Sequence, residues 1–214
     1  SGLVALALVG CQPGQAAQAA AAPDRAATPD EVGGTVPATQ DAPPRAALPV
    51  KAPVPDFSLQ RQDGQPVTLA RMRGQVWLAS FIFTRCTTIC PLISEKLKKL
   101  EQRSLREAGA LKLVSISVDP DHDTPEVLSA YGKKFGVDFD RWQFWTGERA
   151  QVQKLVTDGF KQLIIPAPSA PGGPPDILHG GALVLVDQAG KVRASYESHE
   201  VELDLLLKDV RSLL

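Results

Sequence analysis

Apolar and polar residues follow an ordered pattern only after about residue 50 of the chain. Residues 1–10 form a short apolar run, and residues 12–50 are rich in Ala, Pro, Gln and Gly without any hydrophobic period. A segment of that composition cannot bury enough apolar surface to fold by itself. Residues 51–214 have the pattern of a globular chain, and their number suits one domain with a sizeable core.

Strands and amphipathic helices are predicted to alternate in residues 51–214. Residues 76–83 form a nearly unbroken apolar run of strand length, as expected for a strand covered on both faces, and residues 111–118 are predicted to be a second buried strand. A hairpin signal at Asp63-Gly64 precedes them. This alternation predicts an α/β sheet covered by helices. The other predicted elements are a strand at 142–145, a hairpin of strands at 182–186 and 192–196, and helices from the Cys86–Cys90 stretch to about 109, at 124–136, 148–158 and 203–214.

The charge of the chain is close to balanced. Its 214 residues include 23 basic and 24 acidic side chains, which gives a formal net charge of −1. Basic side chains do not gather with interleaved aromatic residues, as they do in proteins that bind nucleic acid. We therefore expect no nucleic-acid partner.

Cys11 ends the apolar run at the start of the chain, where small residues precede it. This is the pattern of a bacterial lipoprotein signal, and about ten residues are too few to span a bilayer. We interpret residues 1–11 as a truncated signal ending in lipidated Cys11, and residues 12–50 as a disordered tether. The protein would then be a membrane-anchored lipoprotein on the periplasmic side. The alternative is that the apolar N-terminal segment and the thiol of Cys11 have no function.

Cys86 and Cys90 stand four residues apart, where a strand is expected to give way to a helix. If the helix begins near Cys86, both sulfurs lie on one face, about one turn apart. A disulfide or a shared soft metal ion would result. Helix N-terminal N–H groups and Arg85 would both favour the thiolate form. A purely structural disulfide is the alternative, although a bridge across so short a loop restricts the unfolded chain little.

Four stretches of the sequence match the pattern of one known family. They are Pro55-Asp-Phe-Ser-Leu with Asp63-Gly64, Phe81-Ile-Phe-Thr-Arg-Cys-Thr-Thr-Ile-Cys-Pro91, Ser117-Val-Asp-Pro-Asp-His-Asp-Thr-Pro125, and His179. The combination of a Cys-x3-Cys-Pro motif with an Asp-Pro-x-x-Asp-Thr-Pro motif is specific. On these motifs, about residues 53–213 resemble the Sco/SenC family.

This resemblance implies both a fold and a function. For residues 51–214 it implies a thioredoxin-like fold, with a central mixed sheet flanked by helices and an N-terminal β-hairpin. It implies that Cys86, Cys90 and His179 bind copper, as Cu(I) and in a second state as Cu(II). Members of the family serve the assembly of the CuA centre of cytochrome c oxidase, as metallochaperones, as thiol reductants or as both. The implied partners are the CuA-bearing subunit of the oxidase and other copper donors or thiol reductants.

The chemistry of this ligand set agrees with the resemblance. Two thiolates and an imidazole suit soft Cu(I), whereas zinc, the main competitor, usually takes a fourth ligand. His179 follows the Pro/Gly-rich loop 166–176 and is expected to open a core strand that returns beside the cysteines. We expect His122 to be a solvated loop residue, with a secondary metal contact as the alternative, and His199 to lie on the surface.

Asp119 is predicted to end a core strand, and it matches an aspartate of the family near the metal site. The resemblance implies that it orients a ligand or tunes the thiols; a role in capping the turn is the alternative. For Asp123 we expect only a capping role before Thr124. Leu178 and Gly180 flank His179 where many members carry Asp and Ser or Thr, so the hydrogen bonds that hold the imidazole are expected to differ.

Three functions from different classes remain open. The first is a copper metallochaperone, which is mainly a delivery protein rather than an enzyme. The second is a thiol–disulfide oxidoreductase that keeps the CuA cysteines reduced, which would need both cysteines and largely tolerate the loss of His179. The third is a thioredoxin-fold peroxidase, which would need a peroxidatic cysteine in an activating pocket.

Overall fold

The computed structural model describes residues 47–109, 111–167 and 176–214. The predicted lipoprotein signal with Cys11, most of the predicted tether, and residues 168–175 of the loop before His179 lie outside the described residues. Leu48 is buried, and its carbonyl oxygen accepts a hydrogen bond from Arg193 Nε at 3.0 Å. No helix in the described ranges is long and apolar enough to cross a membrane.

An eight-stranded mixed sheet, in the order β1-β10-β9-β4-β5-β6-β2-β3, forms the centre of the fold. Strands β4, β5 and β6 run parallel, while β9 joins β4 in the antiparallel direction. Every residue of β4 is buried, as its unbroken apolar run predicts for a strand covered on both faces. The strands are β1 (Ala52–Pro53), β2 (Ser58–Arg61), β3 (Pro66–Thr68), β4 (Val76–Ile82), β5 (Leu111–Ser117), β6 (Trp142–Thr146), β9 (Ala182–Val186) and β10 (Lys191–Glu197).

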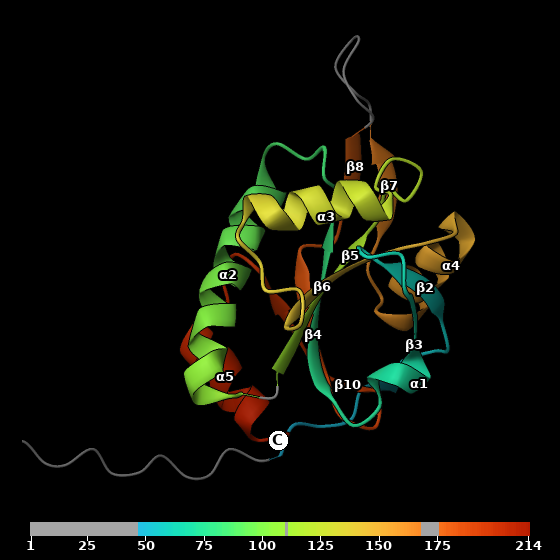
Figure 1. Ribbon diagram of the computed structural model, residues 1–214. Helices are drawn as coiled ribbons and strands as arrows, with labels where there is room; N and C mark the ends of the chain where they lie inside the picture. The colour runs from blue at the N-terminus through green and yellow to red at the C-terminus, as the bar shows by residue number, and fades with distance from the viewer. Residues whose placement is uncertain (1–46, 110, 168–175) are drawn as a thin grey trace, which may run out of the picture. The chain divides into compact units, whose positions relative to one another are not determined.

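Helices cover both faces of this sheet (Figure 1). The crossovers β4–α2–β5 and β5–α3–β6 step along the sheet in the same direction, so the right-handed rule puts both helices on one face. The C-terminal helix α5 lies beside α2, and Arg103 pairs with Asp204 across them at 2.5 Å. The helices are α1 (Leu69–Met72), α2 (Ile89–Glu107), α3 (Pro125–Lys134), α4 (Arg149–Gln153), which continues as a π-helix (Lys154–Gly159), and α5 (Leu203–Arg211).

The predicted architecture, a mixed sheet flanked by helices with an N-terminal hairpin, is confirmed. The segment before His179 differs from the prediction. Strands β7 (Ile164–Ala167) and β8 (Asp176–His179) pair with each other in a separate two-stranded sheet, which we call the β7–β8 arm. His179 therefore ends β8 and does not open a core strand. The core strand β9 begins three residues later, at Ala182. Figure 1 shows the arm projecting at the end of the molecule where α2 begins.

Candidate metal centre

Cys86 lies in the turn before α2, and Cys90 lies in the first turn of the helix, which begins at Ile89. A helix that begins near Cys86, the condition for placing both sulfurs on one helical face, is therefore not found. Helix N-termini carry N–H groups without an intrahelical acceptor, and here the N–H of Cys90 donates to the Cys86 sulfur at 3.5 Å. The N-cap residue Thr88 makes no side-chain cap; its hydroxyl lies 3.6 Å from the same sulfur. The Cys86 sulfur thus occupies the acceptor position at this helix start.

The two thiols have different acidities. Burial raises the pKa of the Cys86 thiol, but N–H groups of Cys90 and Thr88 and the Thr88 hydroxyl outweigh it, so the net shift is downward. Cys90 is fully buried, and this burial, reinforced by the neighbouring Cys86, raises the pKa of its thiol far above the usual range. The expected effect of helix N–H groups thus applies to Cys86 and not to Cys90. Both cysteines are free thiols in this structure.

His179 faces the cysteines from the base of the β7–β8 arm. Its Nε2 atom lies 3.6 Å from the Cys90 sulfur, and its Nδ1 atom lies 3.1 Å from the carbonyl oxygen of Gly180. Because a carbonyl oxygen only accepts, Nδ1 carries the hydrogen and the Nε2 lone pair faces the sulfur. The ring also packs edge-on against Phe83, at 5.7 Å between centroids. A backbone carbonyl therefore holds the imidazole here, as outer-shell partners hold metal-binding histidines.

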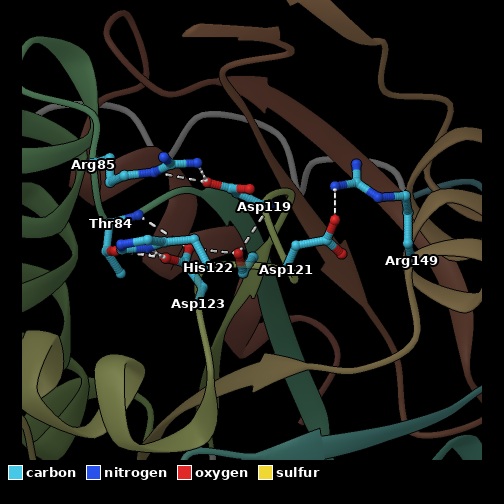
Figure 2. Close-up of polar contacts among 8 residues, drawn as sticks. Thr84, Arg85, Asp119, Asp121, His122, Asp123 and Arg149 are labelled. Carbon is cyan, nitrogen blue, oxygen red and sulfur yellow. Dashed lines mark hydrogen bonds and ion pairs between the residues drawn. The ribbon is translucent and has the colours of Figure 1, made fainter. Parts of the chain in front are cut away.

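Asp119 contacts the turn that carries the cysteines (Figure 2). Its Oδ2 atom accepts hydrogen bonds from Arg85, from Nη2 at 2.5 Å and from Nε at 3.1 Å. Asp119 is buried, and its own N–H donates to the hydroxyl of Ser117. The partner identified for Asp119 is therefore the residue before Cys86. It also explains why Arg85 does not act on the thiols as expected, since its guanidinium is directed to this carboxylate.

Asp123 is not a helix cap, contrary to our expectation. The N-cap of α3 is Thr124, whose hydroxyl accepts the N–H of Val127 at 3.4 Å. The fully buried carboxylate of Asp123 instead accepts from the N–H of Thr84 at 3.1 Å and from its hydroxyl at 2.5 Å. It also accepts from the Ser117 hydroxyl at 2.6 Å and faces His122 Nδ1 at 3.0 Å. Figure 2 shows Thr84 and His122 converging on this carboxylate.

Asp119, His122 and Asp123 together have the composition of an ion site, because their ligand atoms lie within 4.8 Å of one another. Internal donors already occupy this cluster, since Arg85 binds Asp119 and Thr84 and Ser117 bind Asp123. The side chain of His122 is 41% exposed, in the manner expected of a loop residue.

His199 lies on the surface beside Glu200, as expected. Of the three histidines of the chain, His179 is thus the one placed at the thiols. Two sulfurs and an imidazole nitrogen make a set of soft donors, which selects copper over hard cations. A thiol of lowered pKa beside a buried thiol also suits disulfide exchange.

Comparison with known proteins agrees with this site. The sequence profile of the SCO1/SenC family matches residues 46–214. The "Putative copper-binding protein" of Stutzerimonas stutzeri is 30% identical over 147 residues, which cover 68% of this chain and 70% of that protein.

Two solved structures with 32% sequence identity are similar to this one. A SCO1/SenC family lipoprotein from Bacillus anthracis has a TM-score of 0.69, with 76% of this chain and 95% of that chain covered. BsSco, a member of the Sco family of cytochrome c oxidase assembly proteins in which a disulfide switch has been identified, has a TM-score of 0.67, with 78% and 96% covered. The fold is the thioredoxin-like fold of these structures.

Proposed function

The chain belongs to the SCO1/SenC family, and on this premise we propose that it is a copper-binding protein of cytochrome c oxidase assembly. In this proposal Cys86, Cys90 and His179 hold the ion, which is delivered to the CuA-bearing subunit of the oxidase. The name of the Stutzerimonas stutzeri relative supports copper, and the family of BsSco supports oxidase assembly. Copper is the cargo of the protein, bound as Cu(I) and in a second state as Cu(II).

The observation that carries the proposal is the separation between Cys90 Sγ and His179 Nε2. With metal–sulfur and metal–nitrogen distances of about 2.3 and 2.0 Å, a ligand angle of about 110–120° separates the two ligand atoms by about 3.5–3.7 Å. The observed separation is 3.6 Å. An ion could therefore bind both atoms without movement of the arm. Three ligands leave an open position, so an incoming ligand of the acceptor can bind before a donor ligand leaves.

The place of delivery is a separate part of the proposal, and it depends on the lipoprotein-like pattern before Cys11. We propose that Cys11 carries lipid and that residues 12–50 tether the domain at the periplasmic side of a membrane. The similarity to the Bacillus anthracis lipoprotein supports this anchoring. Other copper donors or thiol reductants would act on the same pair of cysteines.

Disulfide exchange is a second candidate function, favoured by the contrast between the two thiols. The Cys86 thiolate would attack a disulfide of the partner and form a mixed disulfide, releasing one partner thiolate. Cys90 would then lose its proton, attack the Cys86 sulfur and release the second partner thiolate. The partner is reduced by two electrons, and Cys86 and Cys90 are oxidised to a disulfide. A copper donor that must leave its target cysteines reduced could perform both reactions.

An anaerobic Cu(I) titration of the reduced full chain against a competing chelator tests the proposal. We expect one tightly bound ion in the wild type, weaker binding in His179→Ala, and unchanged binding in the control His199→Ala. Loss of binding in the Cys86→Ser, Cys90→Ser double variant identifies the thiols as ligands. If the wild type binds Cu(I) weakly and His179→Ala binds it equally, the copper role is rejected and thiol exchange remains. Peroxide turnover above that of a free thiol would favour the peroxidase.

A further inference from the structure

The turn that contains Cys86 is hydrogen-bonded to the loop between β5 and α3. Thr84 and Arg85 directly precede Cys86, and each contacts a different carboxylate of this loop, Asp123 and Asp119 respectively. Both side-chain oxygens of Asp123 face Thr84, one toward its N–H and the other toward its hydroxyl. One side chain therefore fixes both the backbone and the side chain of Thr84.

Because Asp123 is buried, loss of these hydrogen bonds would be costly in free energy. Its side chain has no exposed surface, and a buried carboxylate is costly unless each oxygen has donors. Ser117, the last residue of β5, supplies one of these donors. The carboxylate thus ties the cysteine turn to the end of a central strand, which is one of the most rigid parts of an α/β fold.

The same turn places the Cys86 sulfur next to the N–H of Cys90, in the first turn of α2. The Cys86 N–H donates to Phe83 at 3.1 Å, and its sulfur receives the N–H of Cys90 at 3.5 Å. A small rotation of the backbone at Thr84 would move this sulfur away from Cys90. The hydrogen bonds of Asp123 oppose such a rotation.

We propose that Asp123 is a positioning residue for the thiol pair. Its carboxylate holds the Thr84–Cys86 turn so that the two sulfurs lie together, both for a shared ion and for disulfide closure. The inference deepens the proposed function and rests on it for copper, while its consequence for disulfide closure stands without copper. Asp119 contacts the same turn through the side chain of Arg85, which is more exposed than that of Asp123. We therefore expect Asp119 to contribute less than Asp123 to the position of the thiols.

The test compares Asp123→Asn with a matched control, Asp187→Asn. Asp187 is also a buried aspartate that holds a turn: it accepts the N–H groups of Ala189 and Lys191, both at 2.9 Å, and Arg193 Nη1 at 2.9 Å. It follows the end of β9 opposite to the end near His179. Each substitution replaces one carboxylate oxygen, which accepts hydrogen bonds, with an NH2 group. This group is a donor and cannot accept the hydrogen bonds that the oxygen accepted.

Three quantities are measured: two report on the thiols and one reports on the stability of the fold. The first is the equilibrium in which the protein dithiol and oxidised glutathione give the protein disulfide and two molecules of reduced glutathione, measured without metal. The second is Cu(I) affinity, and the third is urea unfolding of the reduced full chain. For Asp123→Asn we expect about a tenfold fall in the disulfide-forming equilibrium constant and in Cu(I) affinity. For Asp187→Asn we expect lower stability with both thiol readouts unchanged.

The outcomes separate positioning from general destabilisation. Asp123→Asn that folds and keeps both thiol readouts within twofold of wild type would overturn the inference, as would an equal shift in Asp187→Asn. If Asp123→Asn fails to fold, Thr84→Val decides, because it removes one donor to Asp123 and keeps the backbone N–H. An unchanged glutathione equilibrium in Thr84→Val would then reject the inference. A wild type without tight copper binding would reject the proposed function alone, since the glutathione readout needs no copper.

Discussion

The turn that carries the cysteines and the arm that carries His179 meet at one site, yet the structure supports them differently. The turn is held by buried carboxylates at the end of β5, through Asp119 and Asp123. Within the described ranges, β7 and β8 pair with each other and with no strand of the eight-stranded sheet. A two-stranded sheet is marginally stable by itself. The thiols are therefore the fixed half of the site, and the imidazole is the half that local changes in pairing can adjust.

This difference suits a protein that releases what it binds. A fixed pair of sulfurs keeps the capacity for disulfide closure and for holding an ion. Under the proposed function, a histidine supplied by a separate two-stranded arm can add or withdraw one ligand without a change in strand pairing in the central sheet. The contacts of His179 with Gly180 and with Phe83, which directly follows β4, orient the ring, and Ile164 and Ile177 of the arm pack against the core.

Removal of either sulfur should have the largest effect. We expect Cys86→Ser and Cys90→Ser each to lower Cu(I) affinity by more than about a hundredfold, beyond the range of an outer-shell change. Chelator competition on the full chain measures this. Binding within tenfold of wild type in either variant would break the comparison, because the thiols would then not be the fixed half of the site.

Alkylation should distinguish the two thiols strongly. The pKa of Cys86 is lowered, so its thiolate, the reactive form, is present at a lower pH than for a free thiol. The pKa of Cys90 is strongly raised by burial, so its thiol stays protonated through neutral pH. At pH 7 we therefore expect Cys86 to react faster than Cys90. Iodoacetamide labelling from pH 5 to 9, with peptide mass spectrometry, measures both rates. Equal rates would contradict the asymmetry.

Loosening the arm should act on copper and not on the disulfide. Ile164 pairs with His179 across the arm and packs against the core, so Ile164→Ala should lower Cu(I) affinity about tenfold. Its glutathione equilibrium should equal that of wild type. The matched control is Ile165→Ala, because Ile165 is the next residue and is 49% exposed. A change in the disulfide equilibrium of Ile164→Ala would show that arm and turn are not independent.

The smallest effect is expected at His122. Its ring is partly exposed and adds one contact to a carboxylate that Thr84 and Ser117 already bind. His122→Asn should change Cu(I) affinity and the glutathione equilibrium less than about threefold, within the range of a surface contact. A larger loss of affinity would instead assign His122 to the metal site.

Much of the fold was predictable because it depends on local patterns. The nearly unbroken apolar run of β4 indicates a strand covered on both faces, and all its residues are buried; β5, the second strand predicted to be buried, is buried except at Lys112. Thr124 with Pro125 marked the start of α3, where the structure has its N-cap. The β7–β8 arm was missed, since its strands are short, contain Pro166 and are separated by a Pro/Gly-rich stretch that reads as loop.

The sequence by itself determined the family, the sheet with its helices, and the three residues Cys86, Cys90 and His179 as candidates for one site. The sheet and its helices follow from the periodicity of apolar residues, whereas the family and the three site residues follow from the resemblance of the sequence motifs to the Sco/SenC family. Only the tertiary structure decided how these residues meet. It made the Cys86 sulfur an acceptor for the helix start, and it directed Asp123 to Thr84 instead of to a helix cap. The contact between Asp123 and Thr84 joins residues that are 39 positions apart in the chain, and burial, which no local pattern specifies, sets its strength.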